Sequence, residues 1–296
     1  MIHLAGMKML YHICSKGLES EILFASEKEF IAGMNRVAVC YLLSLKDGRE
    51  IKILAFCLMD NHWHFILYGE ELACLRFAAR FKKLTSMWVT EHRGKPLVEK
   101  PVIGHWPIAY EKIADKISYV LRNPVAAGMG VHPAAYRWSS ASLVFSQAAP
   151  DFWGKRNTEN ISMKGKRRIA YTRVLIPDFW AVGPDSMIWP GNYVDFQMAE
   201  KYFGSLGKYM FAMNNSNVDK DTEMEMMDGG PSLADGELKT KAIACAEQNF
   251  GKTTLGECSA MERVAIARTL RKKYGCNVKQ LARVLQLNPQ ELKLVL

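Results

Sequence analysis

The sequence predicts an α+β fold, in which an antiparallel sheet carries helices on one face and an all-helical module follows. Three observations lead to this prediction. In roughly the first 125 residues, alternating apolar stretches and stretches of helical periodicity follow in the order strand, helix, strand, strand, helix, strand, helix. That order is typical of a ferredoxin-like arrangement. A polar, acidic segment then precedes a tail in which only helical patterns occur.

The strands of this arrangement are short and apolar. They are expected at residues 9–15, 51–58, 62–68 and 102–108. The helices between and after them are expected at residues 26–45, 72–92 and 110–121. Ser26 and Glu29 have the spacing of a capped helix start, and Pro124 stops the third helix.

The second half of the chain is less regular. We expect four parts in all, namely a first domain over 1–150, an accessory subdomain over 151–215, a linker over 216–236 and a helical domain over 237–296. The accessory part opens with a basic stretch and ends with a helix over 194–213, whereas the linker is acidic and rich in Gly.

The tail contains three short helical patterns, at 260–274, 278–285 and 289–296. A short turn joins the last two, which is the shape of a helix-turn-helix. Basic residues outnumber acidic ones here. The tail is therefore predicted to bind DNA, with a protein partner as the alternative.

Composition sets broad limits on function. The chain has 296 residues, of which 49% are hydrophobic, enough for one large domain or two smaller ones. A net charge of +9 favours a polyanionic partner, usually nucleic acid. Seven scattered cysteines without a Cys-x-x-Cys pair argue against a zinc ribbon and favour reduced thiols in a cytoplasm. No apolar segment is long enough to span a bilayer, so no membrane partner is expected.

The most informative stretch is 59–67, where two histidines flank one bulky apolar residue in a predicted strand. Side chains on a strand alternate between faces, so His62 and His64 point one way while Trp63 points into the core. An isolated His-x-His is most often a pair of polar residues on a half-exposed strand. Two imidazoles on one face can also hold one divalent metal ion.

A second motif follows on the predicted helix at 110–121. Tyr119 and Asn123 are four residues apart and share a helix face. A tyrosine can attack a phosphodiester and stay attached to the product, while a metal ion polarises the phosphate. The alternatives are a core tyrosine and, for Asn123, a C-terminal helix cap.

Together these motifs resemble the HUH single-tyrosine transposases of insertion sequences, and among them the REP-associated tyrosine transposases. Residues 59–64 are similar to that family's Met-Pro-Asn-His-Val-His, and residues 119–128 to its Tyr-Ile-x-x-Asn-Pro-Val-x-Ala-Gly. Residues 11–17 resemble its first strand, which usually ends Ser-Arg-Gly, and residues 136–140 resemble the end of its domain. The resemblance covers roughly the first half of the chain, with four motifs in the right order.

The resemblance implies an HUH nuclease fold and a metal-dependent DNA endonuclease and strand transferase. Tyr119 would be the nucleophile, leaving a 5′-phosphotyrosine and a free 3′-hydroxyl, and His62, His64 and Asn123 would bind Mg²⁺ or Mn²⁺. Either metal-bound water or His12 could take the tyrosine proton. A strand histidine satisfied by hydrogen bonds is the favoured interpretation of His12. The expected substrate is a single-stranded, hairpin-forming repeat, bound by a monomer or a homodimer.

Two other functions stay open. One is a cleavage-silent protein that binds or regulates repeat DNA, and the other is a replication or transfer initiator nuclease with the same chemistry. The chain departs from the family at Asp60, where a proline is usual, at Lys16, where an arginine is usual, and at 104–107, where a Gly-Arg-Tyr-like stretch is usual. These departures bear on the DNA sequence recognised and leave the histidines, tyrosine and amide intact.

Basic residues in both halves are candidates for phosphate contacts, although a solvated surface is an equally good interpretation of any one of them. The candidates are Lys16, Arg76, Arg80, Lys82, Lys83, Arg122, Lys279, Arg283 and Lys293. Four tryptophans are interpreted as core residues rather than as platforms for stacked bases, namely Trp63, Trp88, Trp106 and Trp138.

Overall fold

The computed structural model describes residues 6–15, 22–97, 101–127, 129, 131–146, 156–214, 235–274, 276 and 278–295. The chain forms two compact units. The first comprises Met1–Asn123 with Val131–Asn214, and the second Pro124–Gly130 with Asn215–Leu296. Residues 216–234 of the predicted linker lie outside the described residues. Lys16 and Gly128, which belong to the motifs that resemble the transposase family, also lie outside them.

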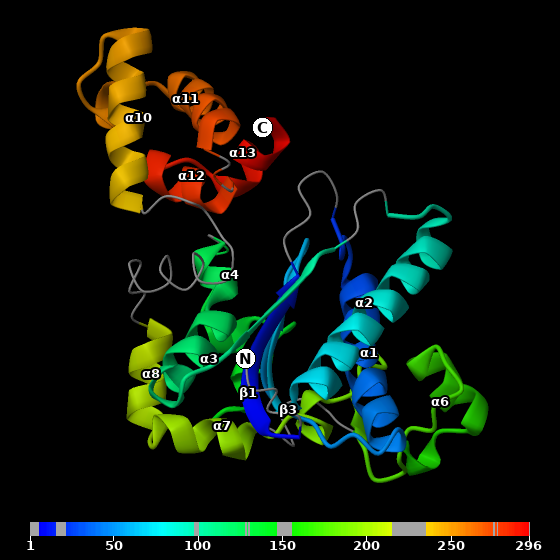
Figure 1. Ribbon diagram of the computed structural model, residues 1–296. Helices are drawn as coiled ribbons and strands as arrows, with labels where there is room; N and C mark the ends of the chain where they lie inside the picture. The colour runs from blue at the N-terminus through cyan, green and yellow to red at the C-terminus, as the bar shows by residue number, and fades with distance from the viewer. Residues whose placement is uncertain are drawn as a thin grey trace. The chain divides into compact units, whose positions relative to one another are not determined.

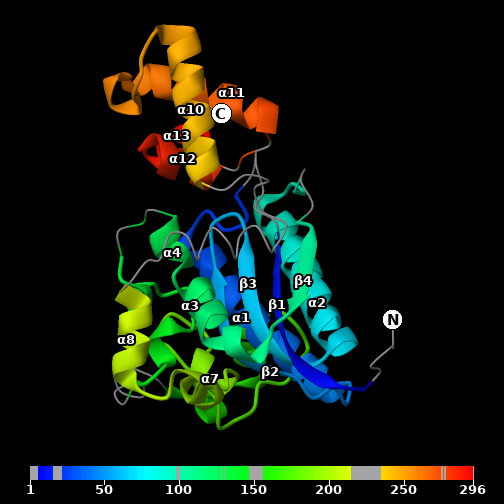
Figure 2. The same ribbon diagram turned by 60° about the vertical axis from the view of Figure 1, so that its left-hand side comes forward.

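The first unit is built on a four-stranded antiparallel sheet, as expected. Its strands are β1 (Lys8–Ser15), β2 (Lys52–Leu58), β3 (Trp63–Glu70) and β4 (Ile103–Pro107). They lie side by side in the order β2-β3-β1-β4, and every neighbouring pair is antiparallel (Figure 2). The sheet therefore has β1 and β3 at its centre, which is the ferredoxin-like order.

Two long helices, α1 (Glu27–Lys46) and α2 (Glu71–Arg93), cover one face of the sheet (Figure 1). The Ser26 hydroxyl accepts a hydrogen bond from the Glu29 amide, which confirms the predicted cap. Trp63 and Phe65 on β3 point to this side, and their rings lie 5.5 Å and 5.1 Å from that of Phe81 on α2. This face is the main apolar core of the unit.

The opposite face carries α3 (Ile113–Leu121), preceded by the 3-10 turn η1 (Tyr110–Lys112) (Figure 2). Helices therefore cover both faces of the sheet, and the prediction of helices on one face is wrong in this respect. The buried Ile117, Val120 and Leu121 give α3 the apolar surface that it needs to pack on strands. The helix ends at Leu121 and the short α4 (Asn123–Ala126) follows, which fits the predicted stop near Pro124.

Residues 131–214 share the core of residues 1–123, because Ile169, Trp180 and Ile188 pack in the same apolar cluster as α1 and α2. Their regular elements are α6 (Met163–Ala170), α7 (Phe196–Phe203), α8 (Leu206–Asn214) and the two-stranded sheet of β5 (Arg156–Asn157) and β6 (Ala181–Val182). Short 3-10 turns complete them, at η2 (Pro133–Ala135), η3 (Ala141–Leu143), η4 (Thr158–Asn160) and η5 (Pro190–Asn192).

The prediction of one helix over 194–213 is wrong, because the chain breaks there into α7 and α8. Gly204 takes a φ of 73° and caps α7 in the left-handed conformation, which glycine adopts without a Cβ clash. The two helices meet through the rings of Phe203 and Tyr209, whose centroids are 5.1 Å apart.

Two downstream segments run along the outer edge of β2. The Leu58 amide donates to the Trp138 carbonyl at 2.9 Å, and the Ser140 amide donates to the Phe56 carbonyl at 3.1 Å. Further along, the Asp195 amide donates to the Ile53 carbonyl at 2.8 Å. The stretch 136–140, which resembles the end of the transposase domain, therefore lies beside this strand.

The second unit is helical. It contains α10 (Asp235–Phe250), η6 (Leu255–Glu257), α11 (Ala260–Tyr274), α12 (Val278–Leu285) and α13 (Pro289–Val295) around a core that includes Leu238, Ile266 and Leu281. Helix α10 was not expected from the sequence, and it begins within the predicted linker. Between α12 and α13, the Asn288 side chain accepts a hydrogen bond from the Gln290 amide at 2.9 Å and caps the last helix.

None of the described helices combines the length and the apolar character needed to cross a bilayer. No disulfide links any of the seven cysteines, all of which lie among the described residues.

Candidate metal and tyrosine site

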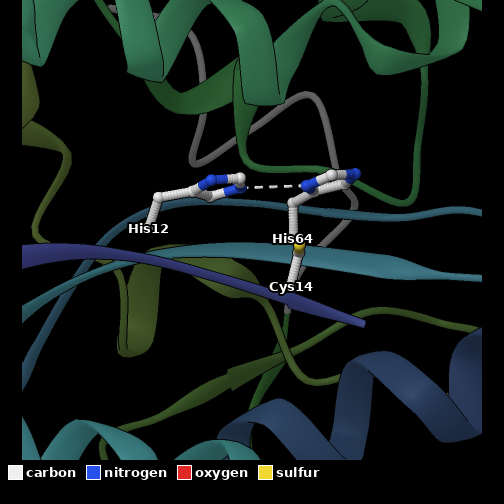
Figure 3. A group of neighbouring side chains, drawn as sticks. All are labelled: His12, Cys14 and His64. Carbon is white, nitrogen blue, oxygen red and sulfur yellow. Dashed lines mark hydrogen bonds between the residues drawn. The ribbon is translucent and has the colours of Figure 1, made fainter. Parts of the chain in front are cut away.

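The face of the sheet under α3 carries the histidines. Because side chains alternate along a strand, Trp63 and Phe65 enter the core beneath α1 and α2, and His64 points the other way. On β1 the same alternation places His12 and Cys14 beside His64 (Figure 3). All three side chains are buried, with exposed fractions of 0%, 6% and 5%.

His12 and His64 form one pair. Nε2 of His12 lies 3.0 Å from Nδ1 of His64, so one proton is shared between the two rings. The rings are stacked within 6° of parallel, with centroids 5.2 Å apart. One ring nitrogen of His12 thus has a hydrogen-bond partner, which fits the interpretation of His12 as a strand histidine held by a hydrogen bond; a role in taking the tyrosine proton stays a prediction.

His62 comes just before β3 and connects the sheet to the end of α3. Its Nδ1 lies 2.7 Å from Oδ1 of Asn61, and its Nε2 lies 3.1 Å from Oδ1 of Asn123. Its ring is perpendicular to that of His64, with centroids 4.9 Å apart. The structure thus brings together His62, His64 and Asn123, the three residues that the sequence predicts as metal ligands.

These contacts fit a divalent cation. A proton on Nδ1 of His62 satisfies Asn61 and leaves a lone pair on Nε2, facing a second lone pair on Oδ1 of Asn123. Two adjacent ligands of an octahedral ion, each about 2.1 Å from it, lie about 3 Å apart, which matches this separation. Metal-bound histidines usually donate their other ring N–H to an oxygen, as His62 can to Asn61.

A second group of possible ligands overlaps the first. His12, Cys14 and His64 offer two ring nitrogens and a sulfur that all lie within 4.8 Å of one another. His64 therefore belongs to both groups. The cluster is buried and could hold a divalent metal.

Tyr119 projects from α3 against this histidine pair. Its ring meets His64 edge-on at 5.7 Å between centroids, and His12 edge-on at 5.9 Å. The side chain is 6% exposed. Nζ of Lys116, one turn earlier on the same helix and also buried, lies 5.0 Å from the centre of the tyrosine ring. The tyrosine ring thus contacts two imidazoles and a lysine side chain.

Four of the predicted DNA-binding residues lie on a helix of the first unit other than the one that carries Tyr119. Those on α2, namely Arg76, Arg80, Lys82 and Lys83, belong to the helix that covers the opposite face of the sheet. Arg80 is held by the Asp47 carboxylate at 2.7 Å. A role for this group in binding DNA remains a prediction.

Arg122 does not fit the prediction of a surface phosphate contact. It is buried, and its guanidinium donates to the Ala212 carbonyl at 2.8 Å, which ties the end of α3 to α8. Lys16 lies outside the described residues, and so does the side chain of Lys279. Arg283 and Lys293 are half-buried residues of the second unit.

The sequence interpretation did not single out two residues of this site. Cys14 is two residues from His12, and the same alternation that pairs His62 with His64 places it on the histidine face. Lys116 is three residues before Tyr119, a helical spacing that brings two side chains together. Both signals are present in the sequence but have no meaning until the site is known.

A comparison with solved structures finds one that is similar to this chain. It is a REP-associated tyrosine transposase bound to a REP hairpin, 11% identical in sequence, and the match covers 50% of this chain and 86% of that chain with a TM-score of 0.34. No protein-family model and no curated protein matches the chain.

Proposed function

We propose that this protein cleaves single-stranded DNA and transfers strands through a 5′-phosphotyrosine intermediate, as a metal-dependent transposase that acts on hairpin or repeat DNA. One observation carries the proposal. A phenol from α3, an amide from the start of α4 and imidazoles from the two central strands lie together on one buried face of the sheet. Such a set can bind a cation, hold a phosphate on it and attack the phosphorus.

In the proposed reaction Tyr119 is the nucleophile. Its hydroxyl oxygen forms a bond to phosphorus as the bond from phosphorus to the 3′-oxygen breaks. The phenolic proton leaves, and a proton reaches the departing 3′-oxygen, which becomes a free hydroxyl. Attack by another 3′-hydroxyl on the phosphotyrosine reverses these steps and returns the proton to Tyr119, so rejoining needs no ATP.

His62, His64 and Asn123 would hold the cation, with water and substrate phosphate as its remaining ligands. A bound Mg²⁺ or Mn²⁺ supplies polarisation of the phosphate and stabilises the charge that develops on it. Lys116 supports the tyrosine, because a cation beside the ring favours the electron-rich phenolate that forms during attack.

Covalent trapping tests the proposal. Purified protein is incubated with end-labelled hairpin single strands and Mn²⁺, and a protein–DNA adduct is sought on a denaturing gel. Wild type should form the adduct and Tyr119→Phe should not. Tyr110→Phe is the matched control, because Tyr110 is 80% exposed and lies in the turn before the same helix.

The result also separates an enzyme from a binding protein. If wild type binds the hairpin tightly but no adduct forms with Mn²⁺ or Mg²⁺, the chain is a repeat-DNA-binding protein and the nuclease proposal is wrong. An adduct that persists in Tyr119→Phe would instead show that another residue is the nucleophile.

A further inference from the structure

The second ligand group on the histidine face differs in chemistry from the first. We propose that His12, Cys14 and His64 form a zinc site, and that zinc bound there excludes the cation of the nuclease site. The zinc site stands on its own geometry, whereas the exclusion rests on the function proposed above.

The geometry of the zinc site is fixed by the sheet. Cys14 and His64 are directly paired across β1 and β3, and His12 is on the same face of β1 two residues away. The ring nitrogens of His12 and His64 are already 3.0 Å apart, and the Cys14 sulfur lies within 4.8 Å of both (Figure 3). Adjacent ligands of a tetrahedral zinc ion lie a little more than 3 Å apart, so small side-chain rotations close the site.

The ligands select the metal. Two imidazoles and one thiolate suit zinc, whereas Mg²⁺ and Mn²⁺ prefer oxygen ligands. On binding, the Cys14 thiol loses its proton to solvent and the sulfur becomes a thiolate ligand. Three protein ligands leave a fourth position for water.

Cys57 shows that pairing with His64 across two strands does not by itself place a cysteine in the ligand cluster. It pairs with His64 from the other side, across β2 and β3. Its sulfur nevertheless lies 3.6 Å from the sulfur of Met59, and it does not belong to the ligand cluster formed by the described residues. The two cysteines have the same strand register to one histidine but different surroundings, which makes Cys57 a matched control.

The exclusion follows from the chemistry of one ring. A neutral imidazole has one nitrogen with a lone pair and one with a proton. Zinc between His12 and His64 requires the lone pair on Nδ1 of His64, the nitrogen that faces His12. The proton then resides on Nε2, which Figure 3 shows on the side of the ring away from His12. With Nε2 protonated, His64 cannot also ligate the cation held by His62 and Asn123.

Cobalt substitution tests the zinc site without any DNA. Metal-free protein is titrated with Co²⁺ and its absorption is recorded. Wild type should show the near-ultraviolet band of a thiolate bound to cobalt and the intense visible bands of a tetrahedral site, and Zn²⁺ should abolish both. Cys14→Ala should lose the thiolate band, whereas Cys57→Ala should keep it. No thiolate band in wild type, or an undiminished band in a folded Cys14→Ala, would overturn the site.

A competition experiment tests the exclusion. Bound Mn²⁺ is followed by electron paramagnetic resonance while one equivalent of Zn²⁺ is added. Zinc should release Mn²⁺ from wild type and from Cys57→Ala, and at least tenfold more zinc should be needed in Cys14→Ala. Release that is equally easy in Cys14→Ala would overturn the exclusion. The cobalt spectra do not depend on DNA cleavage, so failure of the nuclease proposal and failure of the zinc site are distinguishable.

Discussion

The two faces of the central sheet are equally buried but opposite in chemistry. Trp63 and Phe65 are fully buried under α1 and α2, and His12 and His64 are buried to nearly the same degree under α3. Apolar side chains fill the first face, whereas every histidine on the second lies within hydrogen-bond distance of another polar group. Burying a polar group without a partner costs free energy, so these side chains depend on one another for partners in a way that the apolar face does not. The first face is therefore the apolar core of the fold, and the second is the face on which the proposed chemistry would take place.

The largest effect expected from this comparison is on cleavage. His62→Ala combined with His64→Ala removes both predicted imidazole ligands, so adduct formation should fall by about a thousandfold, the rate equivalent of roughly 4 kcal/mol. The fold should survive, as judged by circular dichroism. His105→Ala is the control, because His105 lies on β4 and pairs with the exposed Glu71. Undiminished adduct in the double variant would remove the metal assignment.

A substitution on the apolar face, under α1 and α2, should lower the stability of the fold. Trp63→Ala leaves a large cavity between β3 and α2 and should lower the free energy of unfolding by about 3–5 kcal/mol. Urea denaturation measures this, with His64→Ala as the neighbour on the other face. A Trp63→Ala variant that is as stable as His64→Ala would contradict the division between the two faces.

A smaller effect, on metal affinity, is expected from Asn61, which contacts the proposed ligand His62. Asn61→Ala removes the oxygen that orients His62 through Nδ1, and such losses typically weaken metal affinity about ten- to a hundredfold. Calorimetric titration with Mn²⁺ measures the change. Affinity equal to that of wild type would show that Asn61 does not fix the orientation of His62.

An ion pair in the helical layer of the apolar face should give the protein a modest acid sensitivity. Burial raises the pKa of the Glu29 carboxyl, but hydrogen bonds from Arg93 and from the Ala25 amide outweigh it, so the pKa lies below its ordinary value of 4.5. Both Glu29 oxygens accept from Arg93 at 2.7 Å, which joins the start of α1 to the end of α2.

A carboxyl whose pKa is lowered by folding stabilises the folded state above its unfolded pKa, and this contribution is lost as the pH falls through the folded pKa. The free energy of unfolding should therefore fall by about 1 kcal/mol more in wild type than in Glu29→Gln between pH 6 and pH 3. Equal losses in the two proteins would show that this pair does not set the acid response.

The smallest effect is expected from basic residues on α2. Arg76 and Lys83 are exposed on the helix that covers the face opposite Tyr119. Arg76→Ala and Lys83→Ala should therefore change the rate of adduct formation by less than about twofold at moderate salt, since single exposed charges contribute little. A large loss would mean that DNA wraps around to this face.

Much of the first unit is predictable from local patterns. The strand alternation placed Trp63 in the core and both histidines on the other face, and the cap at Ser26 follows from a four-residue signal. The helical spacing from Tyr119 to Asn123 likewise indicates a shared face, and the structure brings both residues to the histidines. These features depend on neighbours within one strand or one turn of helix.

Features that depend on distant parts of the chain were missed. The burial of Arg122 depends on Ala212, ninety residues further on, and the position of α3 depends on its packing against β2 and β3 together. The break at Gly204 was not predicted because the helical pattern continues through it, and a single glycine does not by itself indicate a left-handed turn. The start of α10 was not recognised because acidic residues occur in linkers and also stabilise the first turn of a helix.

The segments beside β2 have a consequence for how copies of this protein can associate. An uncovered outer strand offers its amides and carbonyls to any extended chain and so invites sheet-to-sheet aggregation. Here Phe56 and Leu58 already have backbone partners at 138–140, and Ile53 has one at Asp195. Growth of the sheet at that margin is blocked. Among the described residues no strand pairs with the outer side of β4, so strand addition from another chain would have to begin there.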